Sequence, residues 1–451
     1  MPRRIFGRAH SRAPLHNRTR AIASLLIAIL LMTVSLAHAD ENAPSIPEAM
    51  PLIDEGDQDI LNILLIGAAT NNPANPGLTD SLLVVSINRT ASTVSVVSIP
   101  RDLYTYLPGF GMYKINTAYF YGENNAVEGG GIGLLKATIR YNLGLNIDFY
   151  ARINFTGFGQ LIDELGGIAI TVDCTIRDWK LISPELDKQL AENYEMYTLR
   201  PGLRYLDGEL ALWYVRSRKT SSDLDRGRRQ QDVLRAIWRK IKQEGLLQNL
   251  PRLWDDVQEI VQTDLTLADM LGLLPLANQT DTSDLRYFLF RQRHEVINDY
   301  SDAGQAVLIP QHDAVHELMQ NVVLPPPSAR GAVQRPRVAV INASEIPGMA
   351  AVAADRLELE GFETIVLEEP ASYRQYNHII DYTGTTKGNP IDRIQHLLRV
   401  TTEGVEITPD ANRDYDYRVY IGWMYQYWSC TRDVIQPPAD DATPTPEPTP
   451  P

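Results

Sequence analysis

Three apolar runs of strand length lie close together near the start of the sequence, at residues 60–66, 81–87 and 93–99. The last two are rich in valine and isoleucine, and a short polar turn, Asn88-Arg89-Thr90, joins them. This pattern favours an antiparallel pair inside a larger sheet. Because such a sheet is stable only when its apolar faces are covered, the chain must supply further layers.

Helical periodicity alternates with further strand-like runs in the following residues. The sequence predicts strands at 150–155 and 168–172, and helices at 131–142, 157–165, 229–241, 248–262 and 267–274. Proline lacks a backbone N–H, so Pro275 should end the last of these helices. The alternation predicts an α/β fold in which helices cover the faces of a sheet.

The N-terminus determines the expected location. Residues 1–20 are rich in arginine and contain no acidic residue, and an apolar run follows at 21–37. By the positive-inside rule, residues 1–20 are cytoplasmic and everything after residue 40 lies outside the membrane. A retained transmembrane anchor at 21–39 and a signal peptide cleaved after Ala37-His38-Ala39 are both open. The protein is therefore expected at the cell membrane or, after cleavage, to be secreted.

A chain of 451 residues is too long for one ordinary core, so two folded domains with extensions are expected. We assign a tether to 40–58, a first domain to 59–325, a Pro-rich linker to 326–335 and a small α/β domain to 336–428. The low-complexity tail at 429–451 is expected to be disordered. Cys174 and Cys430 can form a disulfide only in an oxidising compartment, and two free thiols are equally open.

A dense basic segment stands out on a chain whose formal net charge is −14. It contains Arg216, Arg218, Lys219, Arg226, Arg228 and Arg229. Like charges brought together repel unless an anion lies between them, and the planar arginine side chain is suited to phosphate. The external location and the overall acidity argue against nucleic acid. A solvated surface helix would explain the later basic residues, but not this segment, which lacks an apolar period.

Arg101 and the residues around it form a second motif, Ser98-Ile99-Pro100-Arg101-Asp102, at the end of a predicted strand. Arg101 either projects from the carboxyl end of the sheet toward a ligand or belongs to a solvated turn. No P-loop, HExxH, CxxC or GxSxG motif is present in the sequence.

The order of these motifs resembles that of the LytR-CpsA-Psr family of cell-envelope proteins. The matching segments are TDS at 79–81, SIPRD at 98–102, YKINTAY at 113–119, and YVRSR followed by D..R..RQ at 214–230. The resemblance covers about residues 59–325. The segment 337–363, RVAVINASEIPGMAAVAADRLELEGFE, is similar to the LytR C-terminal domain.

The resemblance implies a three-layer α/β/α sandwich with an apolar tunnel, and a phosphotransferase reaction outside the membrane. A glycopolymer would move from a polyprenyl-pyrophosphate lipid to a peptidoglycan sugar hydroxyl. The helices at 132–139, 155–165 and 233–241 would line the tunnel. A non-catalytic binder of the lipid or of wall glycan, and a polyprenyl-pyrophosphate hydrolase, are the alternatives.

Matching positions imply the site residues. Pyrophosphate would be bound by Arg101, Arg216, Arg218, Arg226, Arg229 and Gln230. The catalytic set would be Arg101, Arg216, Arg218 and Asp223, with Asp223 positioning or deprotonating the acceptor. Asp80 would hold Mg²⁺, although Ala69 stands where the family usually has a second aspartate and Leu78 where it often has arginine. One aspartate together with substrate phosphate and water can be enough for Mg²⁺.

Overall fold

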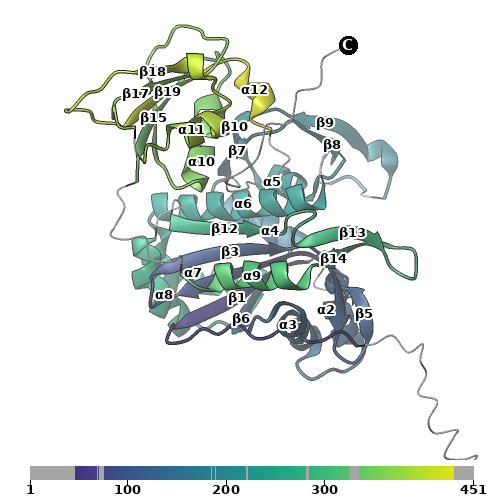
Figure 1. The fold of residues 1–451 in the computed structure, drawn as a ribbon. Coiled ribbons are helices and arrows are strands. Elements are labelled where there is room, and N and C mark those ends of the chain that lie inside the picture. The colour runs from purple at the N-terminus through teal and green to yellow at the C-terminus, as the bar shows by residue number, and fades with distance from the viewer. Residues whose placement is uncertain are drawn as a thin grey trace, which may run out of the picture. The chain divides into compact units, whose positions relative to one another are not determined.

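The central sheet of the first domain has six strands in the order β11-β6-β1-β2-β3-β12 (Figure 1). These strands are β1 (Ile60–Ala68), β2 (Thr79–Asn88), β3 (Thr93–Ile99), β6 (Phe149–Asn154), β11 (Val261–Thr263) and β12 (Leu285–Leu289). The β2–β3 pair is antiparallel, as the turn at Asn88-Arg89-Thr90 predicts. β1 pairs antiparallel with β2 and parallel with β6, so the sheet is mixed.

The computed structural model describes residues 46–68, 70, 76–183, 185–187, 189–219, 222–280, 284–325, 335–386 and 388–430. The predicted anchor or signal at 21–39, most of the linker at 326–335, and the tail from 431 onward lie outside these residues, as does Ala69. Within the described ranges, no helix is long and apolar enough to cross a membrane.

The remaining elements of the first domain follow in chain order. The strands are β4 (Tyr104–Leu107), β5 (Gly111–Lys114), β7 (Ile168–Val172), β8 (Ile176–Leu181), β9 (Tyr194–Leu199), β10 (Gly202–Leu206), β13 (Val296–Tyr300) and β14 (Ala306–Pro310). The helices are α2 (Ala118–Asn124), α3 (Gly130–Leu143), α4 (Phe155–Glu164), α5 (Gly208–Arg216), α6 (Asp223–Gln243), α7 (Leu250–Ile260), α8 (Leu267–Gln279) and α9 (His312–Val323).

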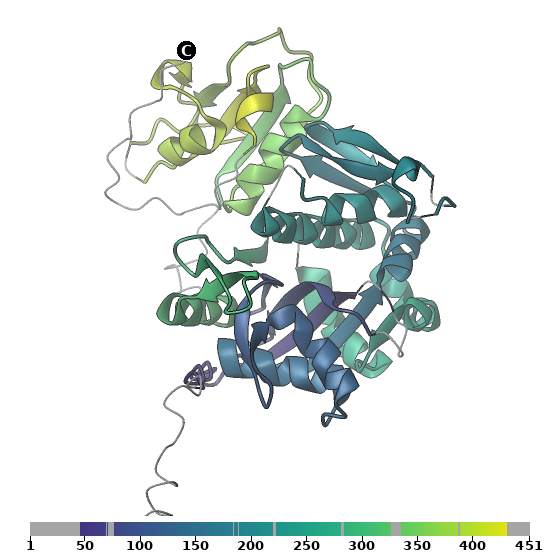
Figure 2. The ribbon, with the colours of Figure 1, turned by 90° about the vertical axis from the view of Figure 1, so that its right-hand side faces the viewer.

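Helices cover both faces of the sheet (Figures 1 and 2). Alternate residues of β1 point to opposite faces, because side chains of a strand alternate. Leu64 and Ile66 pack in the core cluster that includes residues of α3 and α9. Ile63 belongs to the cluster on the other face, with Trp254 of α7. The domain is a three-layer α/β/α sandwich, as the resemblance implied.

Two predicted helices differ from the observed ones. α8 continues past Pro275 to Gln279, so the prediction that Pro275 ends it was wrong. Proline removes only the hydrogen bond to the carbonyl of Leu271, and that residue is exposed enough for solvent to replace the bond. α6 begins at Asp223, earlier than predicted, because the Ser222 and Asp225 side chains form a capping box.

The segment expected to be a tether contacts the first domain over part of its length. Met50 and Ile53 are buried in the core cluster of the sandwich. Their backbone N–H groups donate to the carbonyls of Tyr141 and Gly144, at 2.8 and 3.0 Å. The two apolar side chains explain this contact, since leaving them in water would expose apolar surface.

The C-terminal domain is a five-stranded sheet in the order β16-β15-β19-β17-β18 with helices packed on it. Its elements are β15 (Arg337–Asn342), α10 (Met349–Leu359), β16 (Glu363–Leu367), β17 (His378–Asp381), α11 (Ile391–Leu398), β18 (Val405–Ile407), β19 (Tyr417–Ile421) and α12 (Tyr425–Trp428). The small α/β domain predicted from the sequence is therefore present.

Several bonds join the C-terminal domain to the first domain. Cys174, just after β7, forms a disulfide with Cys430, just after α12. This settles the choice that the sequence left open. Beside it, the Ser429 hydroxyl donates to the Asp173 carbonyl at 2.7 Å. Asp355 of α10 accepts hydrogen bonds from Thr171 of β7 at 2.8 Å and from Arg239 of α6 at 3.2 Å.

Candidate active site

A glycine allows α6 to lie close against the end of β3. A Cβ atom at Gly227 would lie 2.7 Å from the Ser98 hydroxyl oxygen, which is too close for any larger residue without a shift. The neighbouring residue Arg226 and Arg101, which follows β3, line the same cavity. The close approach thus brings together two basic motifs that are more than a hundred residues apart in sequence.

Polar contacts fix the side chains at this end of the sheet. The Nη1 atom of Arg101 donates to Asp80 of β2 at 3.1 Å. The next residue of β2, Ser81, donates its hydroxyl to Oε1 of Gln230 on α6 at 2.9 Å. Asp102 pairs with Lys114 at 2.7 Å and lies 3.8 Å from Nε of Arg101, so Asp80, at 3.1 Å, is the closer carboxylate to Arg101. These contacts orient Arg101 and Gln230 from two sides of one space.

The C-terminal end of α5 and the loop after it supply two further arginines, Arg216 and Arg218. The guanidinium carbon of Arg216 lies 4.2 Å from the centre of the Phe155 ring, a distance typical of a cation–π contact. The backbone N–H groups of Arg218 and Lys219 donate to Asp178 of β8, at 2.7 and 3.1 Å. Burial would raise the pKa of Asp178, but these backbone hydrogen bonds hold it below its usual value. The loop that carries Arg218 is thereby anchored to an ionised carboxylate.

Arg229 is placed differently from the other predicted site arginines. It is buried and does not line the cavity described below. Its guanidinium donates to the carbonyls of Tyr214, at 3.0 Å, and Ser217. Because those two carbonyls flank Arg216, Arg229 joins α6 to the segment that carries the site arginines. Burial lowers the pKa of Arg229.

A cavity of about 320 Å³ lies between the sheet and helices α4, α5 and α6. Its polar lining brings together the predicted residues Asp80, Arg101, Arg216, Arg218, Arg226 and Gln230, together with Ser81 and Asn154. Its apolar lining comes from Leu65, Ile66, Leu83, Ala151, Ile153, Phe155, Phe158, Leu161, Leu212, Val215, Val233, Leu234, Ile237 and Val261. One space therefore has an apolar body and a strongly cationic end.

The lining agrees only in part with the helices expected around a tunnel. Those at 155–165 and 233–241 contribute, but Leu134, Leu135 and Ile139 of α3 pack in the core on the other side of the sheet. Their place is taken by Leu212 and Val215 of α5, which sequence reasoning missed. The sequence could have indicated this, because Leu212 and Val215 come shortly before Arg216, which ends α5. Asp223 opens α6, but its side chain lies outside the described part of the structure.

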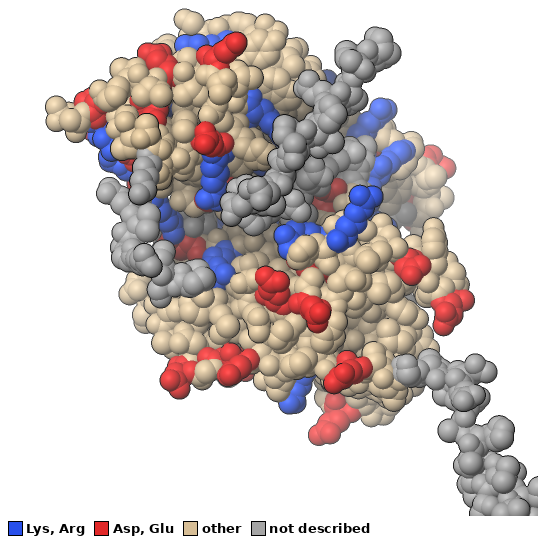
Figure 3. All heavy atoms as spheres, in the orientation of Figure 1, with Lys and Arg blue, Asp and Glu red and all other residues tan. Residues whose placement is uncertain are grey.

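Charge around the cavity is unbalanced. Among its described lining residues, four arginines face a single carboxylate, that of Asp80. Figure 3 shows basic side chains near the middle of the molecule at the level of α5 and α6, and mainly acidic ones lower down. A cluster of this kind favours a ligand with several negative charges, such as a pyrophosphate.

The donor set suits a divalent cation only when a ligand completes it. In the described ranges, no group of three or more His, Cys, Asp or Glu side chains is arranged to hold a metal. Asp80 is also shared with Arg101. Mg²⁺ commonly takes one or two protein carboxylates and completes its shell with phosphate and water, so Asp80 fits it as one ligand beside a bound pyrophosphate.

The comparisons with known proteins agree with the geometry. The model of the LytR_cpsA_psr family matches residues 31–322, and a model described as LytR cell envelope-related transcriptional attenuator matches 335–425. The chain is 32% identical over 247 residues to the polyisoprenyl-teichoic acid–peptidoglycan teichoic acid transferase TagT of Bacillus subtilis. That match covers 54% of this chain and 70% of TagT.

Two further similarities are to TagU and TagV. TagU of Oceanobacillus iheyensis is also named as a polyisoprenyl-teichoic acid–peptidoglycan teichoic acid transferase. It is 31% identical to this chain over 245 residues, which are 53% of this chain and 71% of TagU. The crystal structure of B. subtilis TagV superposes with a TM-score of 0.48 at 22% identity, over 60% of this chain and 100% of that one. The family models and the transferase relatives show that this chain belongs to the LytR-CpsA-Psr family and carries a LytR C-terminal domain.

Proposed function

We propose that this protein transfers a glycopolymer from a polyprenyl-pyrophosphate lipid to a sugar hydroxyl of peptidoglycan. The observation that carries the proposal is the cavity whose apolar body ends at Arg101, Arg216, Arg218 and Arg226. A long prenyl chain and a pyrophosphate, joined in one molecule, are the complement of that surface. The names of TagT and TagU, both polyisoprenyl-teichoic acid–peptidoglycan transferases, support the same chemistry.

The apolar lining would bind the lipid through burial of its hydrocarbon, which contributes about 0.8 kcal/mol for each CH₂ group removed from water. The arginines would bind the pyrophosphate through charge-assisted hydrogen bonds, which are shorter and stronger than neutral ones. Arg229 would act as a positioning residue, because it holds the carbonyls on either side of Arg216.

In the proposed reaction, the oxygen of the acceptor hydroxyl attacks the phosphorus that carries the glycopolymer. A bond from that phosphorus to the new oxygen forms, and its bond to the bridging oxygen breaks. Polyprenyl monophosphate leaves with the electron pair, and the arginines stabilise the negative charge that develops on it. Asp223, at the first turn of α6 and three residues before Arg226, would position the acceptor and take its proton.

Mg²⁺, if bound, would be held by Asp80 together with the substrate phosphates, and it would neutralise part of their charge. We expect Asp80→Asn to raise the Mg²⁺ concentration for half-maximal binding by on the order of tenfold, because the cation loses its charged protein ligand. Calorimetric titration of Mg²⁺ into the protein with a short polyprenyl pyrophosphate measures this. An unchanged Mg²⁺ affinity would instead limit Asp80 to orienting Arg101.

The reaction would take place outside the cytoplasmic membrane, next to the lipid and the wall. The disulfide between Cys174 and Cys430 supports this location, since disulfides persist in oxidising compartments. The arginine-rich segment before the apolar run at 21–37 supports the same orientation. The cell membrane is the proposed site of action, with the folded domains on the outer side.

The direct test is turnover of a short synthetic polyprenyl-pyrophosphate glycan by the full chain, with peptidoglycan fragments as acceptors. We expect the glycan to appear on the fragments and polyprenyl monophosphate to be released in equal amount. Release of phosphate-bearing glycan into water, with none on the fragments, would identify a hydrolase. Tight lipid binding without release would identify a non-catalytic binder. Ala69 and Leu78 favour this alternative, because they replace the aspartate and the arginine that the family usually has near the metal ligand Asp80.

A further inference from the structure

A second cavity, of about 440 Å³, lies in the C-terminal domain. We call it the C-terminal pocket; its polar lining includes Thr383, Thr385, Asn389, Arg413, Asp416 and Tyr417. Tyr417 of β19 pairs with Val338 of β15 and with Asp381 of β17, so three strands bring their ends to one edge of the sheet. None of the candidate active-site residues lines this pocket.

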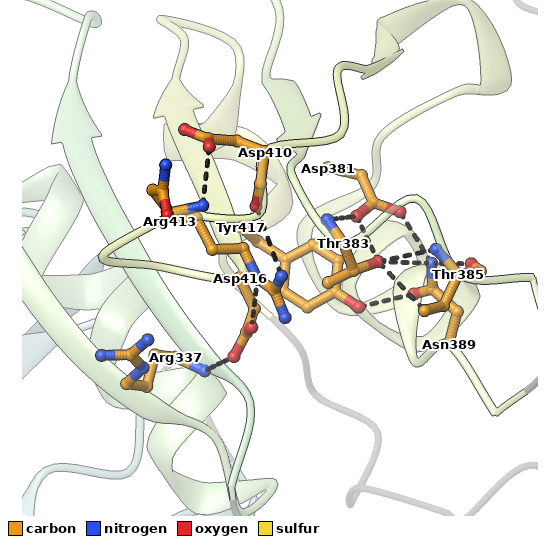
Figure 4. Close-up of polar contacts among 10 residues, drawn as sticks. Arg337, Asp381, Thr383, Thr385, Asn389, Asp410, Arg413, Asp416 and Tyr417 are labelled. Carbon is orange, nitrogen blue, oxygen red and sulfur yellow. Dashed lines mark hydrogen bonds and ion pairs between the residues drawn. The ribbon is translucent and has the colours of Figure 1, made fainter.

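The base of the C-terminal pocket is fixed by a connected set of hydrogen bonds (Figure 4). Asp381 is 1% exposed. It accepts from the backbone N–H and hydroxyl of Thr383, at 2.7 and 2.6 Å, and from the Asn389 amide at 2.7 Å. Asn389 in turn accepts from the Tyr417 hydroxyl at 2.6 Å. A buried polar network that is satisfied in this way holds its members in one arrangement before any ligand binds.

A cation is held at the side of the pocket. Nε of Arg413 donates to one oxygen of Asp416 at 2.8 Å, and the backbone N–H of Arg337 donates to the other at 2.9 Å. Burial would raise the pKa of Asp416, but these two hydrogen bonds lower it, so the carboxylate stays ionised. Asp416 therefore orients Arg413 through Nε alone and does not bind the two terminal nitrogens of the guanidinium. Within the described residues, the Nη2 atom of Arg413 has no hydrogen-bond partner, and Nη1 has only a long contact, 3.4 Å, to the Asp410 carbonyl.

The chemistry of the wall limits the class of ligand. Hydroxyl, amide and backbone groups share the lining with the charged residues Arg337, Arg413 and Asp416. Tyr417 also lines the pocket, but its ring is buried and offers no face for stacking. An apolar ligand would leave these groups desolvated without partners. A molecule with many hydroxyls would satisfy them, and the free edge of Arg413 calls for one acidic group. The volume of about 440 Å³ lies in the range of pockets that hold small ligands.

We propose that the C-terminal pocket binds a saccharide that carries one carboxylate or phosphate group. The inference deepens the proposed function, on which it rests for the source of the saccharide: a peptidoglycan muramic acid that carries no stem peptide would bring a carboxylate, and a glycopolymer unit would bring a phosphate. In either case the pocket would hold one glycan partner of the transfer reaction away from the cationic cavity.

The test is calorimetric titration of the full chain with three probes. These are the N-acetylglucosamine–N-acetylmuramic acid disaccharide, a phosphorylated N-acetylglucosamine, and the neutral N-acetylglucosamine disaccharide. We expect an acidic probe to bind at least about tenfold more tightly than the neutral one, and Arg413→Gln to weaken it by a similar factor. The tighter acidic probe identifies the source. Arg393→Gln, which changes an arginine of the same domain outside the pocket, should leave the affinity unchanged.

A second variant protects the result against misfolding. Thr385 is exposed, so Thr385→Val should leave the fold intact and still weaken the acidic probe several-fold. Equal binding of acidic and neutral probes, or wild-type affinity in Arg413→Gln, would overturn the inference. Transfer without Arg413-dependent binding would refute only this inference, and Arg413-dependent binding without transfer would refute only the proposed function.

Discussion

Arg216→Ala is expected to lower the rate of glycopolymer transfer by about 10²–10³-fold, the usual effect of removing one preorganised donor that stabilises transition-state charge. Arg216 is suited to this test because it lies at the exposed end of α5 and contacts the Phe155 ring rather than a buried partner. Its loss should therefore change the thermal midpoint little, since exposed substitutions usually alter stability by less than about 0.5 kcal/mol.

Single-turnover kinetics with a short polyprenyl-pyrophosphate glycan measures this effect. Arg252→Ala is the matched control, because Arg252 is exposed on α7 and does not line the cavity. Arg216→Lys keeps the charge but loses the planar fork, so we expect a loss between those of the other two variants. A transfer rate within twofold of wild type in Arg216→Ala would remove Arg216 from the proposed mechanism.

The strands were the most predictable part of the fold. β3 and β7 occur at the predicted residues, because runs of valine and isoleucine between polar turns leave little choice of structure. The hairpin β8–β9 was not predicted, since charged and aromatic residues interrupt its alternation. Nor was the start of α6, because its first turn is polar and is set by the capping box of Ser222 and Asp225.

The candidate site could be predicted as a set of residues but not as a shape. Ordered motifs pointed to Arg101, Arg216 and Arg226, which the structure places around one cavity. Sequence spacing could not show that the Arg229 side chain binds the Tyr214 carbonyl and not the cavity, because that depends on the path of the chain after α5. The C-terminal pocket was not foreseen at all, since it is made by loops that meet only when β15, β17 and β19 pair.

Asp355→Asn should have the largest effect on stability, lowering the free energy of unfolding by about 3–5 kcal/mol, the usual result of removing one partner of a buried ion pair. The carboxylate of Asp355 forms an ion pair with Arg235, whose side chain is 4% exposed. Asp232 is a poor replacement, because it lies 3.4 Å from Arg235 and burial raises its pKa to about 6. The variant would therefore leave a buried guanidinium with little compensation.

Equilibrium urea unfolding of the full chain, with the disulfide intact, measures this change. Asp256→Asn is the control, because Asp256 is exposed on α7, and it should stay within about 0.5 kcal/mol of wild type. Arg239 shares Asp355, so adding Arg239→Gln to Asp355→Asn should cost less than the sum of the two single changes. If Asp355→Asn unfolded like Asp256→Asn, the contact between α10 and α6 would not contribute to stability. The effect is separable from catalysis, since Arg235 and Arg239 lie on the face of α6 opposite Gln230, Val233 and Ile237, which line the cavity.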